Sequence, residues 1–140
     1  MFFRPIKMKD DMSNIRKAID NLDDIKLLVD TFYAEVRKDT LIGGIFNGVI
    51  QERWPEHLAK MYRFWQTILL DEYTYEGSPF PPHAQLPLEQ HHFERWLALF
   101  TQTVDQHFYG AGAERAKWQA ARMAQVFLAK IQYLRNQSAT

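Results

Sequence analysis

The sequence predicts an all-α fold, and three observations support this class. Apolar residues recur at the three- and four-residue spacing of helices over most of the chain. No segment alternates apolar and polar residues over enough positions to predict a β-strand. Glycine and proline residues separate the helical segments from one another. With 140 residues the chain has the length of one domain, which we expect to span residues 1–140.

Two helices are expected in the N-terminal part of the chain. The first follows Ser13 and carries apolar residues along one side as far as Leu22. The second begins near Asp23 and Asp24, because acidic residues are favoured at the N-terminus of a helix, and it closes with the basic residues 37–38. Its apolar face contains Ile25, Leu28, Val29, Phe32, Tyr33 and Val36.

The middle of the chain contains an irregular segment followed by a helix. Residues 41–50 are predicted to be irregular, because three glycines surround the apolar pair Ile45 and Phe46. Pro55 fits the first position of the next helix, where its missing N–H group has no intrahelical partner to lose. This helix should end near Asp71. The residues that share one of its faces are His57, Met61, Phe64, Trp65 and Ile68.

A loop and two further helices are expected in the C-terminal half. Residues 72–87 contain four prolines and a glycine, so they are predicted to form a loop, with His83 directly after a pair of prolines. Residues 88–108 then have a strong helical pattern that ends at glycines. A last helix is expected over about residues 113–134.

The composition excludes several classes of site. The chain has no cysteine, which excludes disulfides, thiolate zinc sites, thiolate-ligated iron–sulfur clusters and a cysteine nucleophile. Lys+Arg and Asp+Glu both number 17, so no basic excess indicates nucleic-acid binding. No apolar run approaches the ~20 residues of a membrane helix, and the N-terminus lacks the apolar core of a secretory signal. We therefore expect a cytoplasmic monomer without membrane contact.

The five histidines are the first candidates for chemistry. His91 and His92 are adjacent and do not share a helix face, and His107 lies near a helix end, so these three are expected to be structural or solvated. Local sequence favours an exposed loop position for His83 and a helix-start hydrogen bond for His57. The prolines before His83 nevertheless restrict its backbone, so it would lose little entropy on binding a ligand.

Two aromatic residues carry polar groups on otherwise apolar helix faces. The Tyr33 hydroxyl and the Trp96 indole N–H each need a hydrogen-bond partner when buried, although a tryptophan at such a position most often belongs to the core. Residues 43–48 are glycine-rich but lack the Lys and Ser/Thr of a phosphate-binding loop. Taken individually, none of these residues predicts a function.

The order and spacing of these residues together resemble the truncated haemoglobins, and most closely their group III. The resemblance covers roughly residues 22–135 and leaves residues 1–21 as an extension of unknown role. It implies a globin-like, two-over-two helical sandwich in which a loop largely replaces the proximal helix. The matching pieces are Phe32-Tyr33, Ile45-Phe46-Asn47, Trp54-x-Glu56-His57, Phe64-Trp65, His83 in the proline-rich loop, and Phe93-x-x-Trp96-Leu97.

The resemblance also implies roles for individual residues. His83 matches the proximal iron ligand of the family, and a neutral imidazole is a competent axial ligand. Tyr33 and Trp96 match its distal hydrogen-bonding pair, and His57 matches the distal position that faces the sixth coordination site. The other implied pocket residues are Phe32, Phe46, Met61, Phe64, Trp65 and Phe93, with Lys60 and Arg63 available for the haem propionates.

The function implied by the resemblance is reversible binding of O₂, NO or CO by haem, which we expect to be haem b. Dioxygenation of NO and peroxide activation would use the same polar donors, and a reductase is a possible partner. One alternative is a haem-free globin-like module that binds a protein partner. Two further alternatives concern His57, which could itself bind the iron or swing outward as a gate. We expect the five-coordinate ferrous form to dominate.

Overall fold

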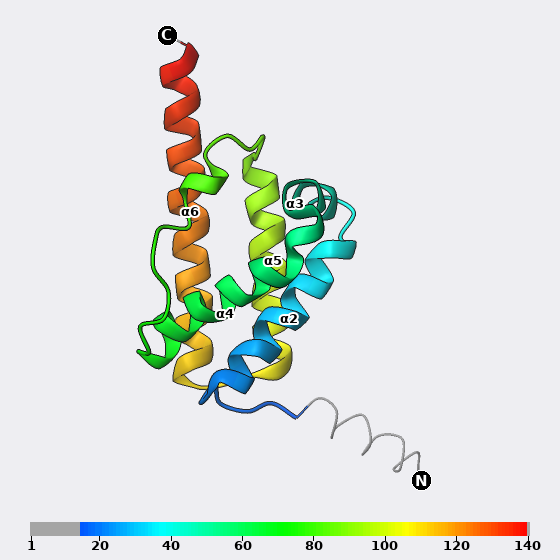
Figure 1. The fold of residues 1–140 in the computed structure, drawn as a ribbon, viewed down its shortest axis with the longest axis vertical. Helices are drawn as coiled ribbons and strands as arrows, with labels where there is room; N and C mark the ends of the chain where they lie inside the picture. Colours follow the sequence, from blue (N-terminus) through cyan, green and yellow to red (C-terminus); the bar gives the residue numbers. More distant parts are fainter. Residues whose placement is uncertain (1–14, 140) are drawn as a thin grey trace.

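The computed structural model describes residues 15–139, which form α-helices joined by short turns and one long loop (Figure 1). The described residues contain no β-strand, so the all-α prediction is confirmed. The α-helices are α2 (Leu22–Lys38), α3 (Gly43–Ile50), α4 (Trp54–Leu70), α5 (Gln90–His107) and α6 (Ala111–Ala139), and the 3₁₀ turns are η1 (Gln51–Arg53) and η2 (Pro81–His83).

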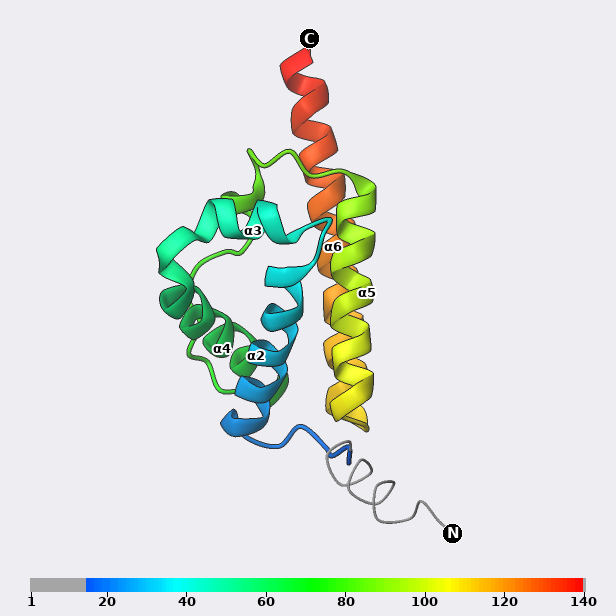
Figure 2. The ribbon, with the colours of Figure 1, turned by 90° about the vertical axis from the view of Figure 1, so that its right-hand side faces the viewer.

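The helices form two layers (Figure 2). Helices α5 and α6 run side by side in one layer, and α2 and α4 pack together in the other. Contacts of α2 with α5, and of α4 with α6, join the two layers. This is the two-over-two sandwich that the sequence predicted. No helix in the described part of the chain has the length and hydropathy needed to cross a membrane.

Helix α2 begins at a cap that the sequence analysis misplaced. The N-cap is Asn21, whose side-chain oxygen accepts a hydrogen bond from the backbone N–H of Asp24 at 3.0 Å. The Asp24 carboxylate in turn accepts from the backbone N–H of Asn21 at 3.2 Å, which completes a capping box. Burial alone raises the pKa of Asp24, but hydrogen bonds from Lys17 and from backbone N–H groups lower it overall. The acidic pair therefore lies inside the first turn of the helix.

The helix predicted after Ser13 is absent from the part of that segment that the structure describes. Residues 15–20 are instead extended, and their backbone pairs with the chain at the end of α5. The backbone N–H of Lys17 donates to the carbonyl oxygen of His107 at 3.1 Å. The backbone N–H of Tyr109 in turn donates to the carbonyl oxygen of Lys17 at 3.0 Å. This pairing satisfies backbone groups that a helix would have bonded internally. Ser13 itself, with the rest of residues 1–14, lies outside the described residues.

The prediction of an irregular segment at residues 41–50 is wrong, because residues 43–50 form α3. Gly43 begins this helix against the end of α2. A Cβ atom at Gly43 would lie 2.9 Å from the carbonyl oxygens of both Val36 and Arg37, so this close approach requires glycine. Tertiary packing thus overrides the poor helix propensity of the three glycines.

Asp39 ties the turn between α2 and α3 to α5. Its carboxylate accepts hydrogen bonds from the backbone N–H groups of Leu41 and Ile42, both at 3.0 Å. The other carboxylate oxygen accepts from the guanidinium of Arg95 at 2.7 Å. The Asp39 side chain is only 3% exposed, and the hydrogen bond from Arg95 holds its pKa below the ordinary value. The Asp39 carboxylate, paired with the half-exposed Arg95, fixes where α3 starts.

The loop between α4 and α5 is anchored at both ends. Near its start, the Thr67 hydroxyl accepts hydrogen bonds from two backbone N–H groups of the loop, at 3.1 and 3.0 Å. Near its end, the Arg135 guanidinium donates to the carbonyl oxygens of Leu86 at 3.3 Å and Leu88 at 2.7 Å. The predicted loop is confirmed, and its one regular element is the turn η2.

The other predicted helices agree with the structure to within a few residues. Pro55 lies in the first turn of α4, and Asp71 caps the end of that helix. Helix α5 ends at His107. Helix α6 begins at Ala111 and continues to Ala139, further than the pattern predicted, so its last turns extend beyond the other helices (Figure 1). The core between the layers is rich in aromatic rings, which contact one another mostly edge to face. Its largest fully buried side chains are Phe32, Phe100 and Phe108.

Candidate functional site

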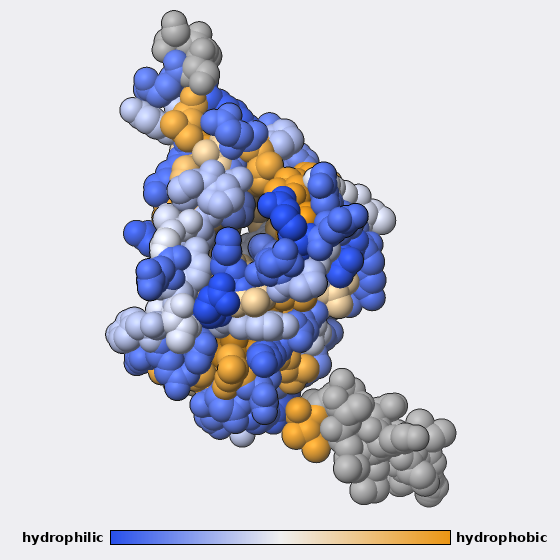
Figure 3. Space-filling model, viewed as in Figure 1, coloured by the Kyte–Doolittle hydropathy of each residue, from blue (hydrophilic) through white to orange (hydrophobic). Residues whose placement is uncertain are grey.

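A cavity of about 360 Å³ lies between the two helical layers and the long loop. This volume is in the range of sites that hold small molecules or cofactors. The surface is hollowed near the middle of the face drawn in Figure 3, where mostly hydrophilic residues border a recess. Aromatic rings dominate the lining, which includes Phe32, Tyr33, Phe46, Phe64, Trp65, Tyr75, Phe93, Trp96 and Phe127.

The cavity brings together all the candidate site residues of the sequence analysis except Arg63. Arg63 is exposed and does not line the cavity, so this geometry gives no support to its contact with a propionate. Lys60 does line the cavity, together with Arg53, which the sequence analysis missed. Arg53 lies in η1 directly after α3, so the wrong prediction for that segment concealed its position. Phe127 was also missed, although it lies on the apolar stripe of α6.

His83 is held in the orientation that a metal ligand needs. Its Nδ1 atom lies 2.7 Å from the carbonyl oxygen of Pro79. Because a carbonyl oxygen only accepts hydrogen bonds, Nδ1 carries the proton and Nε2 keeps its lone pair. The ring packs against Phe127, with 5.0 Å between the ring centroids. Burial lowers the pKa of His83, so its imidazole is neutral near pH 7 and competent to bind a metal.

His57 presents an unsatisfied nitrogen on the cavity. Its Nε2 atom is buried and has no hydrogen-bond partner among the described residues. Burial lowers the pKa of His57 to about 4, and the charges of Lys60 and His83 act in the same direction. The imidazole is therefore neutral near pH 7. A buried polar atom without a partner costs about 1–3 kcal/mol, so a molecule in the cavity that bonds to this atom would be stabilised.

Tyr33 and Trp96 supply two further polar groups to the same cavity. Burial raises the pKa of Tyr33, so its hydroxyl keeps its proton. The ring of Phe32 contacts both side chains: its centroid lies 4.8 Å from the ring centroid of Tyr33 and 5.6 Å from that of Trp96. Neither the Tyr33 hydroxyl nor the Trp96 indole N–H bonds to another residue within the described range 15–139. Both donors are available to a molecule in the cavity.

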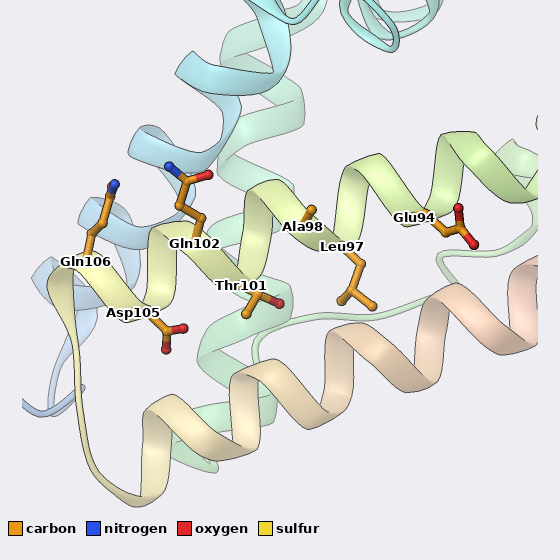
Figure 4. Close-up of a pocket in the computed structure, with 7 residues that line it drawn as sticks. All are labelled: Glu94, Leu97, Ala98, Thr101, Gln102, Asp105 and Gln106. Atoms are coloured by element: carbon orange, nitrogen blue, oxygen red, sulfur yellow. The ribbon is translucent and has the colours of Figure 1, made fainter.

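A second hollow, on the outer surface of α5, is a weaker candidate (Figure 4). All the residues that line it come from this one helix, and their side chains extend outward without converging on a common point. It contains no histidine and no aromatic ring. The residues are Glu94, Leu97, Ala98, Thr101, Gln102, Asp105 and Gln106.

The chemistry of the donor set points to a cofactor-borne metal. Residues 15–139 contain no cluster of three or more His, Asp or Glu side chains that could hold a metal ion. One imidazole with a fixed tautomer, facing a largely apolar cavity, instead fits a metal that brings its other ligands with it. The aromatic walls suit a flat ring system, and Arg53 and Lys60 lie on the lining as cations for acidic substituents.

Comparison with known proteins agrees with this geometry. The model of the family described as bacterial-like globin matches residues 14–129. The chain belongs to the bacterial-like globins. Within this globin, 89 residues are 43% identical to the Group 3 truncated hemoglobin ctb of Campylobacter jejuni, a match that covers 61% of the chain and 70% of the relative.

A solved structure supports the same assignment. The crystal structure of the group III truncated hemoglobin from Campylobacter jejuni matches this globin with a TM-score of 0.76 and 34% identity. The match covers 84% of this chain and 95% of that one. The predicted resemblance to group III truncated haemoglobins and the predicted fold are therefore confirmed. Membership of this family implies haem and the binding of diatomic ligands.

Proposed function

We propose that this globin holds haem b in the cavity, with His83 as the proximal iron ligand, and binds O₂, NO or CO on the side of Tyr33, Trp96 and His57. The observation that carries the proposal is the state of two of the three histidines that line the cavity. His83 has a fixed tautomer with a free Nε2 lone pair, and His57 has a buried Nε2 without a partner. Haem bound there would supply an iron centre that coordinates diatomic ligands.

The proposed role of His83 depends on its local backbone. The bond from Nδ1 to the Pro79 carbonyl keeps the ring from rotating, so little entropy is lost when Nε2 engages a metal. Phe127 supports the ring from the side of α6. Arg53 and Lys60 would pair with the propionates in place of the Arg63 contact that the sequence suggested.

Tyr33 and Trp96 are proposed to hold the bound diatomic ligand by hydrogen bonds. Each donor would contribute about 0.5–1.5 kcal/mol, and more toward a ligand that carries negative charge. At about 1.4 kcal/mol per factor of ten, the two together would slow ligand release by roughly one to two orders of magnitude. The surrounding apolar side chains, including Phe46, Phe64 and Phe93, would exclude water that competes for these donors.

The proposal extends to turnover and cellular setting. The same donors suit NO dioxygenation and peroxide activation. Sustained NO dioxygenation would need a reductase as partner to return the iron to the ferrous state, whereas peroxide activation would need a reducing substrate. Met61 lines the cavity one turn after His57, where it would contact the bound ligand. We further propose a monomer that works in the cytoplasm, with a five-coordinate iron in the ligand-free ferrous form.

Optical spectroscopy tests the proposal directly. The purified protein, with hemin added where needed, should be red-brown, should have an intense band near the edge of the visible range, and should shift that band when reduced and exposed to CO. A protein that is colourless once hemin has been added and the unbound hemin removed would contradict the proposal and favour a haem-free module that binds a protein partner. A six-coordinate low-spin spectrum of the ferrous form, lost in His57→Ala, would contradict the five-coordinate assignment.

A further inference from the structure

Three aromatic rings meet on the distal side of the cavity, at the start of α4. The ring centroids of Tyr33 and His57 are 5.0 Å apart, with an angle of 88° between the planes. The ring of Trp54 lies 5.7 Å from Tyr33 and 5.5 Å from His57, again edge to face. Tyr33 and His57 line the cavity, whereas Trp54 is buried behind them, next to a hollow on the outer surface.

Trp54 is itself fixed by two other elements. Its indole Nε1 donates to the side-chain oxygen of Asn47 on α3 at 3.2 Å. The amide nitrogen of Asn47 donates to the carbonyl oxygen of Arg37 at the end of α2, at 3.1 Å. The Arg37 guanidinium covers a face of the indole, with 4.6 Å from Cζ to the ring centroid. The indole cannot turn without losing these contacts.

The two residues in front of Trp54 have no comparable restraint. No hydrogen bond to another residue in the described part of the chain orients the side chain of Tyr33 or of His57. Their orientation therefore depends on ring packing. Trp54 packs against both rings and is held by a hydrogen bond of its own.

We infer that Trp54 is a positioning residue that aims Tyr33 and His57 at the ligand in the cavity. The inference rests on the proposed function, because it concerns a bound diatomic ligand. Trp54 does not line the cavity and so acts through the two rings in front of it. A smaller side chain at this position opens space behind both rings, so they gain rotamers in which their polar atoms point away from the ligand. Asn47 acts one step further back, by holding the indole.

The test uses the haem-loaded protein and its CO and O₂ complexes. The C–O stretching frequency reports the alignment of polar groups around the ligand, and the O₂ dissociation rate reports the strength of hydrogen bonds to it. Trp54→Phe should shift or split the C–O band and raise the O₂ dissociation rate by about threefold or more. Asn47→Ala should change both in the same direction by less. Asn47→Asp keeps the acceptor oxygen for the indole but loses the donor to the Arg37 carbonyl, so it should change both by less than Asn47→Ala does.

Phe108→Leu is the matched control. Phe108 is a buried ring at the end of α5 and does not line the cavity. Its truncation should lower the melting temperature but leave the C–O band and the O₂ dissociation rate unchanged. If Trp54→Phe does not fold, Asn47→Ala carries the test, since Asn47 is exposed and its loss spares the core.

The outcomes separate the inference from the proposed function. If Trp54→Phe keeps the parental C–O band and O₂ dissociation rate, the inference is overturned and the proposed function stands. The same conclusion follows from Asn47→Ala if Trp54→Phe does not fold. The same changes in Phe108→Leu would overturn it too, because they would then reflect general loss of packing. A parental protein that forms no CO complex would contradict the proposed function, and the inference would fall with it.

Discussion

Different interactions hold the two sides of the cavity. The helical side is formed by α2, α4 and α5, and the loop side is formed by residues 71–89. On the helical side the polar side chains Tyr33 and Trp96 are oriented by neighbouring rings and bond to no described residue. On the loop side His83 is oriented by a hydrogen bond to backbone, and the loop is anchored by Thr67 and Arg135. The orientation of Tyr33 and Trp96 therefore depends on the packing of neighbouring rings, whereas the position of His83 depends on a few hydrogen bonds.

The largest expected effect comes from His83 on the loop side, which we propose to be the proximal ligand. His83→Gly should weaken hemin binding by about tenfold or more, because it removes the axial ligand while the apolar walls remain. Free imidazole should restore the axial-ligand spectrum. Hemin titration followed by absorbance measures both effects, with His91→Ala, at an exposed position, as the control. Equal affinity and an unchanged spectrum in His83→Gly would remove the proposed proximal role.

The helical side is tested by removing each donor while keeping its ring. Tyr33→Phe and Trp96→Phe should each raise the O₂ dissociation rate several-fold, up to about tenfold, since each loses one hydrogen bond to the ligand. Stopped-flow or flash-photolysis kinetics measure the rate. Met123→Leu is the control, because it is a nearly isosteric change at another residue of the cavity lining and removes no donor. Unchanged rates in both donor variants would contradict their role.

A smaller effect is expected where the loop ends. Arg135→Ala leaves the carbonyl oxygens of Leu86 and Leu88 without their charged donor, so the free energy of unfolding should fall by about 1–2 kcal/mol. Denaturant unfolding measures this loss, and faster proteolysis within residues 72–89 would locate it. Arg122→Ala, on the exposed face of α6, should change neither quantity. Equal stability of the two variants would show that the anchor contributes nothing.

The smallest expected effect is the pH dependence contributed by Asp39. Its pKa is lower in the folded protein than the ordinary 3.8, so the folded state binds fewer protons than the unfolded state. This stabilisation is present above about pH 4 and is lost as the pH falls through the lowered pKa. Asp39→Asn should reduce stability by about 1 kcal/mol at pH 7 and flatten the loss below pH 4, as measured by urea midpoints. Glu35→Gln, which removes the exposed pair with Lys38, should have less effect.

Periodicity and spacing predicted the parts of the fold that depend on long apolar faces. Helices α2, α4, α5 and α6 all carry such faces, and the prolines marked the loop. The cavity residues were predictable because the spacing of Tyr33, His57, His83 and Trp96 resembles that of a known family. The haem itself was implied by that resemblance and not by any single motif.

The parts that the sequence did not predict depend on contacts distant in the chain. Helix α3 exists because Gly43 packs against the end of α2, a contact that no local pattern reveals. Residues 15–20 are extended because Lys17 pairs with backbone some ninety positions later. Arg53 lines the cavity from η1, the turn that leads from α3 into α4. The helix propensity of a local segment carries no information on contacts with residues far away in the sequence.

The glycine contact at the start of α3 has a consequence for engineering. Gly43 touches the backbone of α2 with no side chain between them, so this main-chain contact, together with the Asp39 cap, sets the height of α3 over the cavity. Phe46 and Ile50, which α3 carries into the lining, can then be exchanged for side chains of other shapes without shifting the frame that holds them. The part of the cavity lining that α3 supplies can therefore be varied in sequence while the helix stays in place. It is the part of the lining to redesign if the cavity is to admit larger molecules.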